Sequence, residues 1–166
     1  SLTGINIPKF GGLLKVTGDR AFEKSGLTSI VIPSSVTHLG FNWWSGVFLG
    51  CHALTSAVFE PGSQLNMLVF AFQETAITDI IIPASVTILL GTFSECRKLT
   101  SVVFEKDSKL NSMYFAFQNS GLTSLIVPAS VTHIGDGSFH RCYNLTSIIF
   151  EPGSLLAEIG GGAFTN

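Results

Sequence analysis

Residues 122–142 read LTSLIVPASVTHIGDGSFHRC, and close variants of this stretch recur along the chain. The tripeptide Leu-Thr-Ser, or a near variant of it, begins at Leu2, Leu27, Leu54, Ile77, Leu99, Leu122 and Leu145. The intervals between these starts are 25, 27, 23, 22, 23 and 23 residues. A repeat of this length predicts stacked coils of chain, because a single coil cannot bury its own apolar side.

Two further patterns recur in phase with these starts. Each start is followed by apolar residues spaced as in Leu27, Ile30 and Ile32, which predicts one short strand with these side chains pointing inward. Every coil also carries a phenylalanine at an equivalent place, and we expect the rings to stack along the solenoid axis. These residues are Phe22, Phe48, Phe72, Phe93, Phe117, Phe139 and Phe164.

The repeat length and the L-x-x-L-x-L spacing match the leucine-rich repeat. We therefore predict a leucine-rich repeat solenoid, β-rich, with a single parallel sheet of short strands, one per coil, and turns with little regular helix on the other side. One domain of about seven coils is expected over residues 1–166. Because Ser1-Leu2-Thr3 already falls inside the pattern, we also expect this chain to be part of a longer array.

The coils alternate between two types. In one type a proline follows the strand, at Pro33, Pro83 and Pro128. In the other type the strand runs into Phe-Glu and a turn, at Glu60, Glu105 and Glu151. A proline directly after a strand has no N–H to donate, so it predicts the end of that strand.

The segment from Leu122 to Cys142 resembles the BspA-type leucine-rich repeat, whose pattern runs roughly L-T-S-I-x-I-P-x-S-V-x-x-I-G-x-x-A-F-x-x-C. The resemblance covers essentially the whole chain. It implies a cell-surface or secreted protein of a bacterium or a mucosal protist that adheres to host proteins or cells. The expected partner is a protein or glycan on a host or neighbouring cell.

Composition excludes several other classes of protein. The chain is 46% hydrophobic and 12% charged, which argues against disorder. A net charge of -2 offers no basic patch for nucleic acid. No apolar run approaches the ~18 residues needed to cross a bilayer, so we expect no membrane insertion by this segment.

Candidate reactive groups do not assemble into a catalytic or metal site. The cysteines, Cys51, Cys96 and Cys142, fall on every second coil, about 10 Å apart, which is too far for a disulfide. The acids Glu60, Glu105 and Glu151 have the same spacing and are interpreted as solvated turn residues. No acid, base and nucleophile fall on neighbouring coils. We predict a protein that is not an enzyme and needs neither cofactor nor metal.

One candidate binding surface is the outward side of the strands. Outward positions at the same place in each strand form an apolar column, Val31, Val58, Ile81, Val103, Ile126 and Ile149. A second column, Ser29, Ser56, Asp79, Ser101, Ser124 and Ser147, flanks it. The alternative explanation is β-propensity alone, since β-branched residues suit a pleated surface.

A second candidate is an apolar flank in the middle coils. Just before the phenylalanine ladder, other coils carry polar or glycine residues, whereas the middle coils carry large apolar ones. The flank comprises Phe41, Trp43, Trp44, Val69, Phe70, Leu90, Tyr114 and Phe115. Exposed apolar patches mark interfaces. The alternative is a private mini-core in which the insertion around Trp43 folds over Val69 and Phe70.

Three alternatives to adhesion remain open from the sequence. The segment could be a structural spacer, a self-associating module that forms homo-oligomers through its apolar flank, or an engineered binder on this scaffold. The ligand itself is not encoded in any motif that the chain contains.

Overall fold

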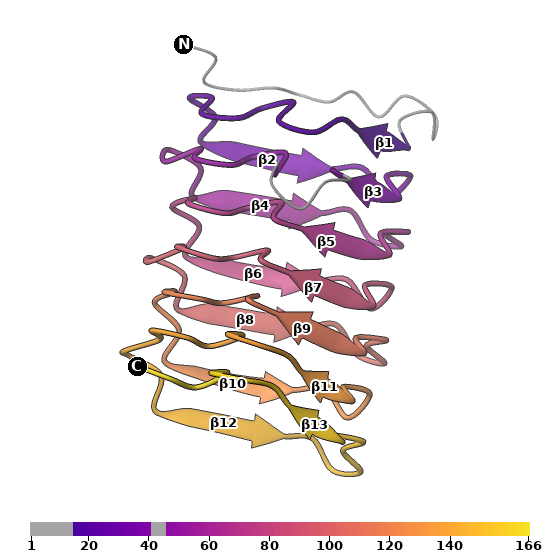
Figure 1. Cartoon of the computed structure of the whole chain (residues 1–166). Coiled ribbons are helices and arrows are strands. Elements are labelled where there is room, and N and C mark those ends of the chain that lie inside the picture. Colours follow the sequence, from indigo (N-terminus) through magenta and orange to yellow (C-terminus); the bar gives the residue numbers. More distant parts are fainter. Residues whose placement is uncertain (1–14, 41–45) are drawn as a thin grey trace.

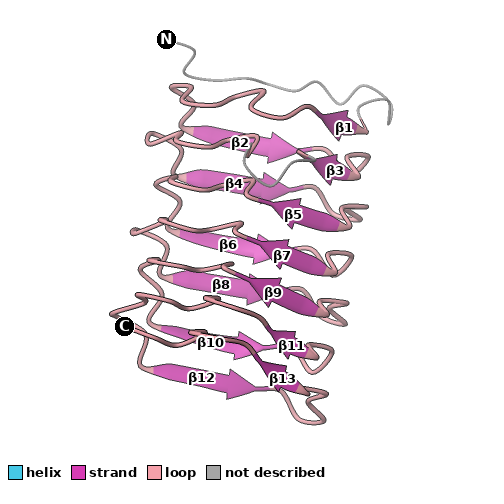
Figure 2. Cartoon of the chain, in the orientation of Figure 1, coloured by secondary structure: helices cyan, strands magenta, loops and turns pink. Residues whose placement is uncertain are grey.

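The computed structural model describes residues 15–40 and 46–166, and it shows parallel coils stacked on one another (Figure 1). The described part consists of short strands and turns, without helix (Figure 2). The repeat strands are β2 (Ser29–Ile32), β4 (Ser56–Phe59), β6 (Asp79–Ile82), β8 (Ser101–Phe104), β10 (Ser124–Val127) and β12 (Ser147–Phe150). The predicted solenoid is confirmed; the coil start predicted near Leu2 lies outside the described residues.

Each coil also contains a second strand, which the prediction of one strand per coil did not include. These strands are β1 (Val16–Thr17), β3 (His38–Leu39), β5 (Met67–Val69), β7 (Ile88–Leu90), β9 (Ser112–Tyr114), β11 (His133–Ile134) and β13 (Glu158–Ile159). They join into one seven-stranded parallel sheet. The coil therefore has two strand-bearing sides linked by turns.

Alternating burial in the repeat strands follows from the two-residue period of a strand. In β6, Ile80 and Ile82 are buried while Asp79 and Ile81 are exposed, and β2 and β10 show the same pattern. The inward residues of all coils merge into one continuous apolar core. The predicted inward spacing is confirmed.

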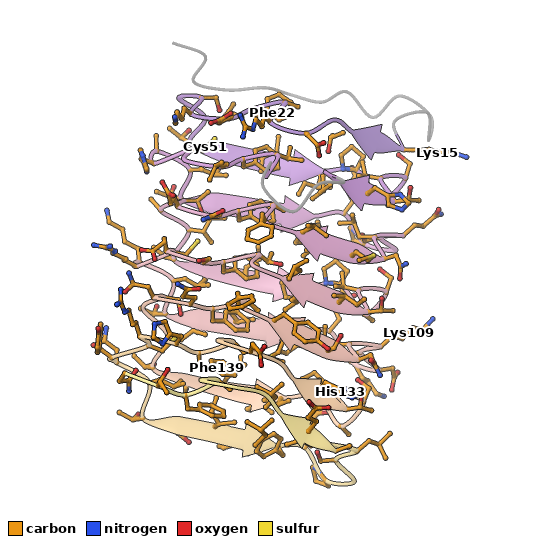
Figure 3. All side chains as sticks on the ribbon, in the orientation of Figure 1. Lys15, Phe22, Cys51, Lys109, His133 and Phe139 are labelled. Atoms are coloured by element: carbon orange, nitrogen blue, oxygen red, sulfur yellow. The ribbon has the colours of Figure 1, made fainter. Side chains whose placement is uncertain are left out.

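The phenylalanine ladder forms as predicted. Ring centroids of successive coils are 5.1 to 5.8 Å apart with interplanar angles of 4 to 15°. The five rings from Phe48 to Phe139 are at most 1% exposed. Figure 3 labels Phe22 and Phe139, near the two ends of the ladder. The ladder sits in a turn whose backbone also links the coils, since Phe93 N–H donates to Ala116 O at 2.8 Å.

The repeat strands pair two by two, which the sequence analysis did not predict. Backbone hydrogen bonds join β2 to β4, β6 to β8 and β10 to β12. Within the described residues none joins β4 to β6 or β8 to β10, although these strands lie side by side (Figure 1).

Proline explains part of this pairing of the repeat strands two by two. Glu105 follows β8 and donates its N–H to Ile82 O of β6, at 3.0 Å. Pro83 occupies the equivalent place after β6, and without an N–H it cannot make that bond to β4. The two coil types therefore produce strand pairs separated by seams.

Candidate functional site

The outward residues of the repeat strands form the predicted apolar column. We call it the sheet-face column: Val31, Val58, Ile81, Val103, Ile126 and Ile149, which are 52 to 59% exposed. Within each strand pair the residues are direct partners, as Ile81 is with Val103. A row of half-exposed aliphatic side chains running along six coils is a surface suited to contact with another molecule.

A column of hydroxyl groups runs beside it and is tied to the backbone. Thr55 Oγ1 donates to Thr28 O of the previous coil at 3.2 Å, and Thr100 and Thr146 make the same bond within their strand pairs. The neighbouring serine column is exposed and contains one acid, Asp79. Hydroxyls anchored in this way give the face a rigid polar border.

The apolar flank is only partly exposed. Phe41, Trp43 and Trp44 lie outside the described residues. Val69 and Leu90 are each 8% exposed, so these two candidates do not contribute to an exposed flank. Tyr114 and Phe115 are 37% and 40% exposed, and Phe70 is half-buried. The described flank therefore presents a small aromatic area, centred on β9.

Three aromatic residues of the flank pack against glycines of the next coil. A Cβ added to Gly91 would overlap the ring of Phe70. A Cβ added to Gly135 would likewise overlap the ring of Tyr114. A Cβ on Gly137 would lie 2.6 Å from Cδ1 of Phe115. The flank aromatics thus cover glycines of the next coil. The alternative in which the insertion around Trp43 folds over Val69 and Phe70 involves residues outside the described part of the chain.

Phe70 and Phe115 also have unusual backbone conformations. Their φ angles are 47° and 49°, in the left-handed region, where the equivalent residues Gly91, Gly137 and Gly162 have φ angles of 54 to 62°. A left-handed residue with a side chain costs about 1–2 kcal/mol. The aromatic-over-glycine contacts must offset that strain.

The cysteines form a structural column. All three are buried and carry free thiols, as predicted. Each Sγ donates to the carbonyl of a ladder phenylalanine in the preceding coil, as Cys96 does to Phe72 O at 3.0 Å. Burial raises the pKa of the Cys96 thiol to about 11 and also raises that of Cys142. Figure 3 shows Cys51 at the opposite end of the coils from Lys109 and His133.

We expect Cys96 to react with thiol reagents at least about 100-fold more slowly in the folded protein than in denaturant at pH 8, because a thiol reacts as its thiolate. Ellman's reagent with and without guanidinium measures this ratio. The raised pKa also means that Cys96 favours the folded state below the unfolded thiol's pKa of ~8.5, and that this contribution is lost as the pH rises toward 11. An intramolecular disulfide found by mass spectrometry would overturn the coil assignment.

The three turn acids have a structural role that the sequence analysis missed. Carboxylate Oε2 of Glu60, Glu105 and Glu151 accepts the backbone N–H of Ser34, Ala84 and Ala129, at 2.9 to 3.1 Å. Each acid therefore holds the residue after the proline of the preceding coil. The acids precede turns and Glu105 and Glu151 are exposed, as interpreted, but each acid also bonds to the neighbouring coil, across 21 to 26 residues of sequence.

Histidines and acids do not gather into a metal site in the described part of the chain. No group of three or more metal-ligating side chains was found there. His38 and His133 bond instead to the neighbouring Thr37 and Thr132 hydroxyls, at 2.9 and 2.6 Å. Nor does any helix among the described residues have the length and apolarity to cross a membrane.

Hollows lie on the surface of the described residues at the corner of the coils and on the sheet face. The larger, about 710 Å³, lies at the corner of the coils between His52 and Arg97. Two of its charged groups pair with each other, Arg97 and Glu95 at 3.2 Å, and Asn119 Nδ2 donates to the same carboxylate at 2.6 Å. The smaller, about 180 Å³, lies on the sheet face along the seam between β4 and β6. Neither hollow was predicted from the sequence.

Comparison with solved structures supports the fold. The crystal structure of the pneumococcal vaccine antigen PcpA is similar, with a TM-score of 0.71 and 27% identity over 84% of this chain and 36% of that one. A leucine-rich cell surface protein from Faecalibacterium prausnitzii A2-165 gives a TM-score of 0.55 and 26% identity over 82% of this chain and 42% of that one. A leucine-rich repeat protein from Bacteroides ovatus gives 0.61 at 20% identity, over 96% and 51% of the two chains.

The chain thus spans about a third to a half of the length of these three structures. No curated protein matches its sequence. The family model of the BspA type leucine rich repeat region matches residues 1–92 and 66–166, with six copies of the repeat. Together these ranges cover every coil, and the chain belongs to the BspA-type leucine-rich repeat family.

Proposed function

We propose that this chain is a non-enzymatic binding module of a cell-surface or secreted protein, and that it holds a protein or glycan of a host or neighbouring cell against its sheet-face column. One observation carries the proposal: six aliphatic side chains, each more than half exposed, stay aligned across six coils. A β-branched residue suits a strand whether or not it binds anything. Threonine, a polar β-branched residue, would suit these exposed strand positions as well, yet all six are valine or isoleucine.

The dimensions of the face support a macromolecular partner. Four-residue strands are about 13 Å long and six coils at ~4.8 Å per step extend about 24 Å, which gives roughly 300 Å². Functional apolar patches on monomers start at about this size. A standard interface buries about 800 Å² per partner, so the partner must also contact the bordering hydroxyl column and turns.

The relatives support the location and the kind of role. One similar structure is described as a cell surface protein and another as a vaccine antigen, which is a role for a molecule displayed to the outside. The thiols and turn acids of this chain are engaged in bonds between coils. We therefore propose recognition, and no chemical step, as the activity of the domain.

The test begins with a partner identified on an array of extracellular host proteins and glycans. We expect Val103→Lys to weaken binding to that partner at least about tenfold, because a charge placed at the centre of an apolar contact must be desolvated. The melting temperature should stay within about 2 °C, since the side chain of Val103 points to solvent and is 53% exposed. Affinity by calorimetry and melting by circular dichroism measure the two quantities.

Tyr143→Lys is the matched control. Tyr143 is 68% exposed and apolar in most of its surface, but it lies at the corner of the coils rather than on the sheet face. It should leave affinity unchanged. Equal effects of the two substitutions, or no effect of Val103→Lys, contradict the proposal. Light scattering that shows a dimer lost in Val103→Lys would assign the face to self-association instead.

A further inference from the structure

The seam between β4 and β6 opens into a hollow on the sheet face. Its volume is about 180 Å³, and it is lined by the four residues of β4, by Asp79, Ile80 and Ile81 of β6, and by Glu105. The strands on either side share no backbone hydrogen bond in the described structure, in line with the missing N–H of Pro83. Ligand pockets for whole small molecules occupy about 300–1,000 Å³. The hollow is therefore of a size for one side chain of a larger partner.

Its chemistry selects a cationic side chain. The walls include the aliphatic Val58 and Ile81, while Asp79 and Glu105 contribute carboxylates. Asp79 is the one acid in a column that is serine in the five other repeat strands. Thr78 Oγ1 donates to Asp79 Oδ2 at 2.8 Å and Ala84 N–H donates to Glu105 Oε2 at 2.9 Å. Within residues 15–40 and 46–166, no lysine, arginine or histidine pairs with either acid.

We propose that this hollow receives an arginine side chain of a protein partner, with its methylene groups against Val58 and Ile81 and its guanidinium on the carboxylate of Asp79. Arginine fits because its stem packs on apolar surface and its planar head binds carboxylates in bidentate fashion. The proposal rests on the proposed function, since the hollow lies within the sheet face. It also specifies a feature of the partner: the partner presents a basic residue at the centre of its apolar contact with the sheet face.

The experiment uses small probes, so that it does not depend on finding the partner. The chain is titrated with N-acetyl-arginine amide and, separately, with N-acetyl-citrulline amide, which has the same shape without the charge. Backbone amide shifts are followed by NMR. We expect saturable shifts at Val58, Ile81 and their neighbours with the arginine probe, and binding about three- to fivefold weaker with citrulline.

Asp79→Ser places in β6 the residue that the other repeat strands carry, so the fold should be retained, which its melting temperature checks. This variant should bind the arginine probe about three- to fivefold more weakly. Equal binding of the two probes, unchanged binding by Asp79→Ser, or shifts only away from β4 and β6 would overturn the arginine site. Those outcomes leave the sheet-face proposal standing, because Val103→Lys tests that proposal with the whole partner.

Discussion

Replacing Phe93 by alanine is expected to lower the free energy of unfolding by about 3–5 kcal/mol. The ring is fully buried and stacks on Phe72 and Phe117 at 5.8 and 5.7 Å, so its removal leaves a cavity in the middle of the ladder. Solenoid stability is a sum over neighbouring coils, so a central break should also uncouple the two halves. Urea melts followed by circular dichroism measure the loss and reveal a second transition.

Phe164→Ala is the matched control for this experiment. Phe164 belongs to the same ladder, but among the described residues it stacks on one ring, that of Phe139, and it is 42% exposed. Its replacement should cost clearly less than that of Phe93 because the truncated site stays open to water. A loss under about 1 kcal/mol for Phe93→Ala would mean that the stacked ring contributes little to the core.

Gly91→Ala is expected to destabilise the fold by about 2–4 kcal/mol. Gly91 has a φ angle of 54°, and an added Cβ would overlap the Phe70 ring of the preceding coil. Left-handed strain contributes about 1–2 kcal/mol, and displacement of the ring contributes the rest. Chemical denaturation of the single variants and of the Phe70→Ala, Gly91→Ala double variant separates the two contributions.

In that cycle the double variant should be less destabilised than the sum of the single variants, by about 1 kcal/mol or more, because Phe70→Ala removes the overlap. Gly62→Ala supplies the strain alone: its φ angle is 76° and its added Cβ would meet nothing within 4 Å. If Gly91→Ala is no more harmful than Gly62→Ala, the aromatic-over-glycine contact does not stabilise the flank.

The coil and its core could be predicted from sequence because their signals repeat in phase. Seven phenylalanines in register with seven leucine starts leave one arrangement that stacks all of them. The alternation of proline and glutamate coils was equally visible. The pairing of the repeat strands two by two could not be predicted from that alternation. It depends on Pro83 standing where Glu105 stands in the next coil, and the Glu105 N–H donates to a carbonyl of the preceding coil.

The second sheet and the exposure of the flank could not be predicted for different reasons. A strand of two residues, such as His38–Leu39, carries no alternation that distinguishes it from a turn. The contacts of Phe70 with Gly91 and of Tyr114 with Gly135 join residues about 20 positions apart, on neighbouring coils, which a local sequence pattern does not reveal. Glu105 likewise accepts the backbone N–H of Ala84 in the preceding coil, and no local sequence pattern predicts this contact.

The most direct test of the central claim, that a partner binds on the sheet face, is photo-crosslinking from single sites. Benzoylphenylalanine is placed in turn at Val103 on the sheet face, at Phe115 on the flank and at Tyr143 at the corner. All three side chains are at least 40% exposed, so the substitutions disturb the core little. We expect crosslinks to the partner from position 103 and none from position 143. Crosslinks from 115 or 143 in the absence of any from 103 would contradict the account.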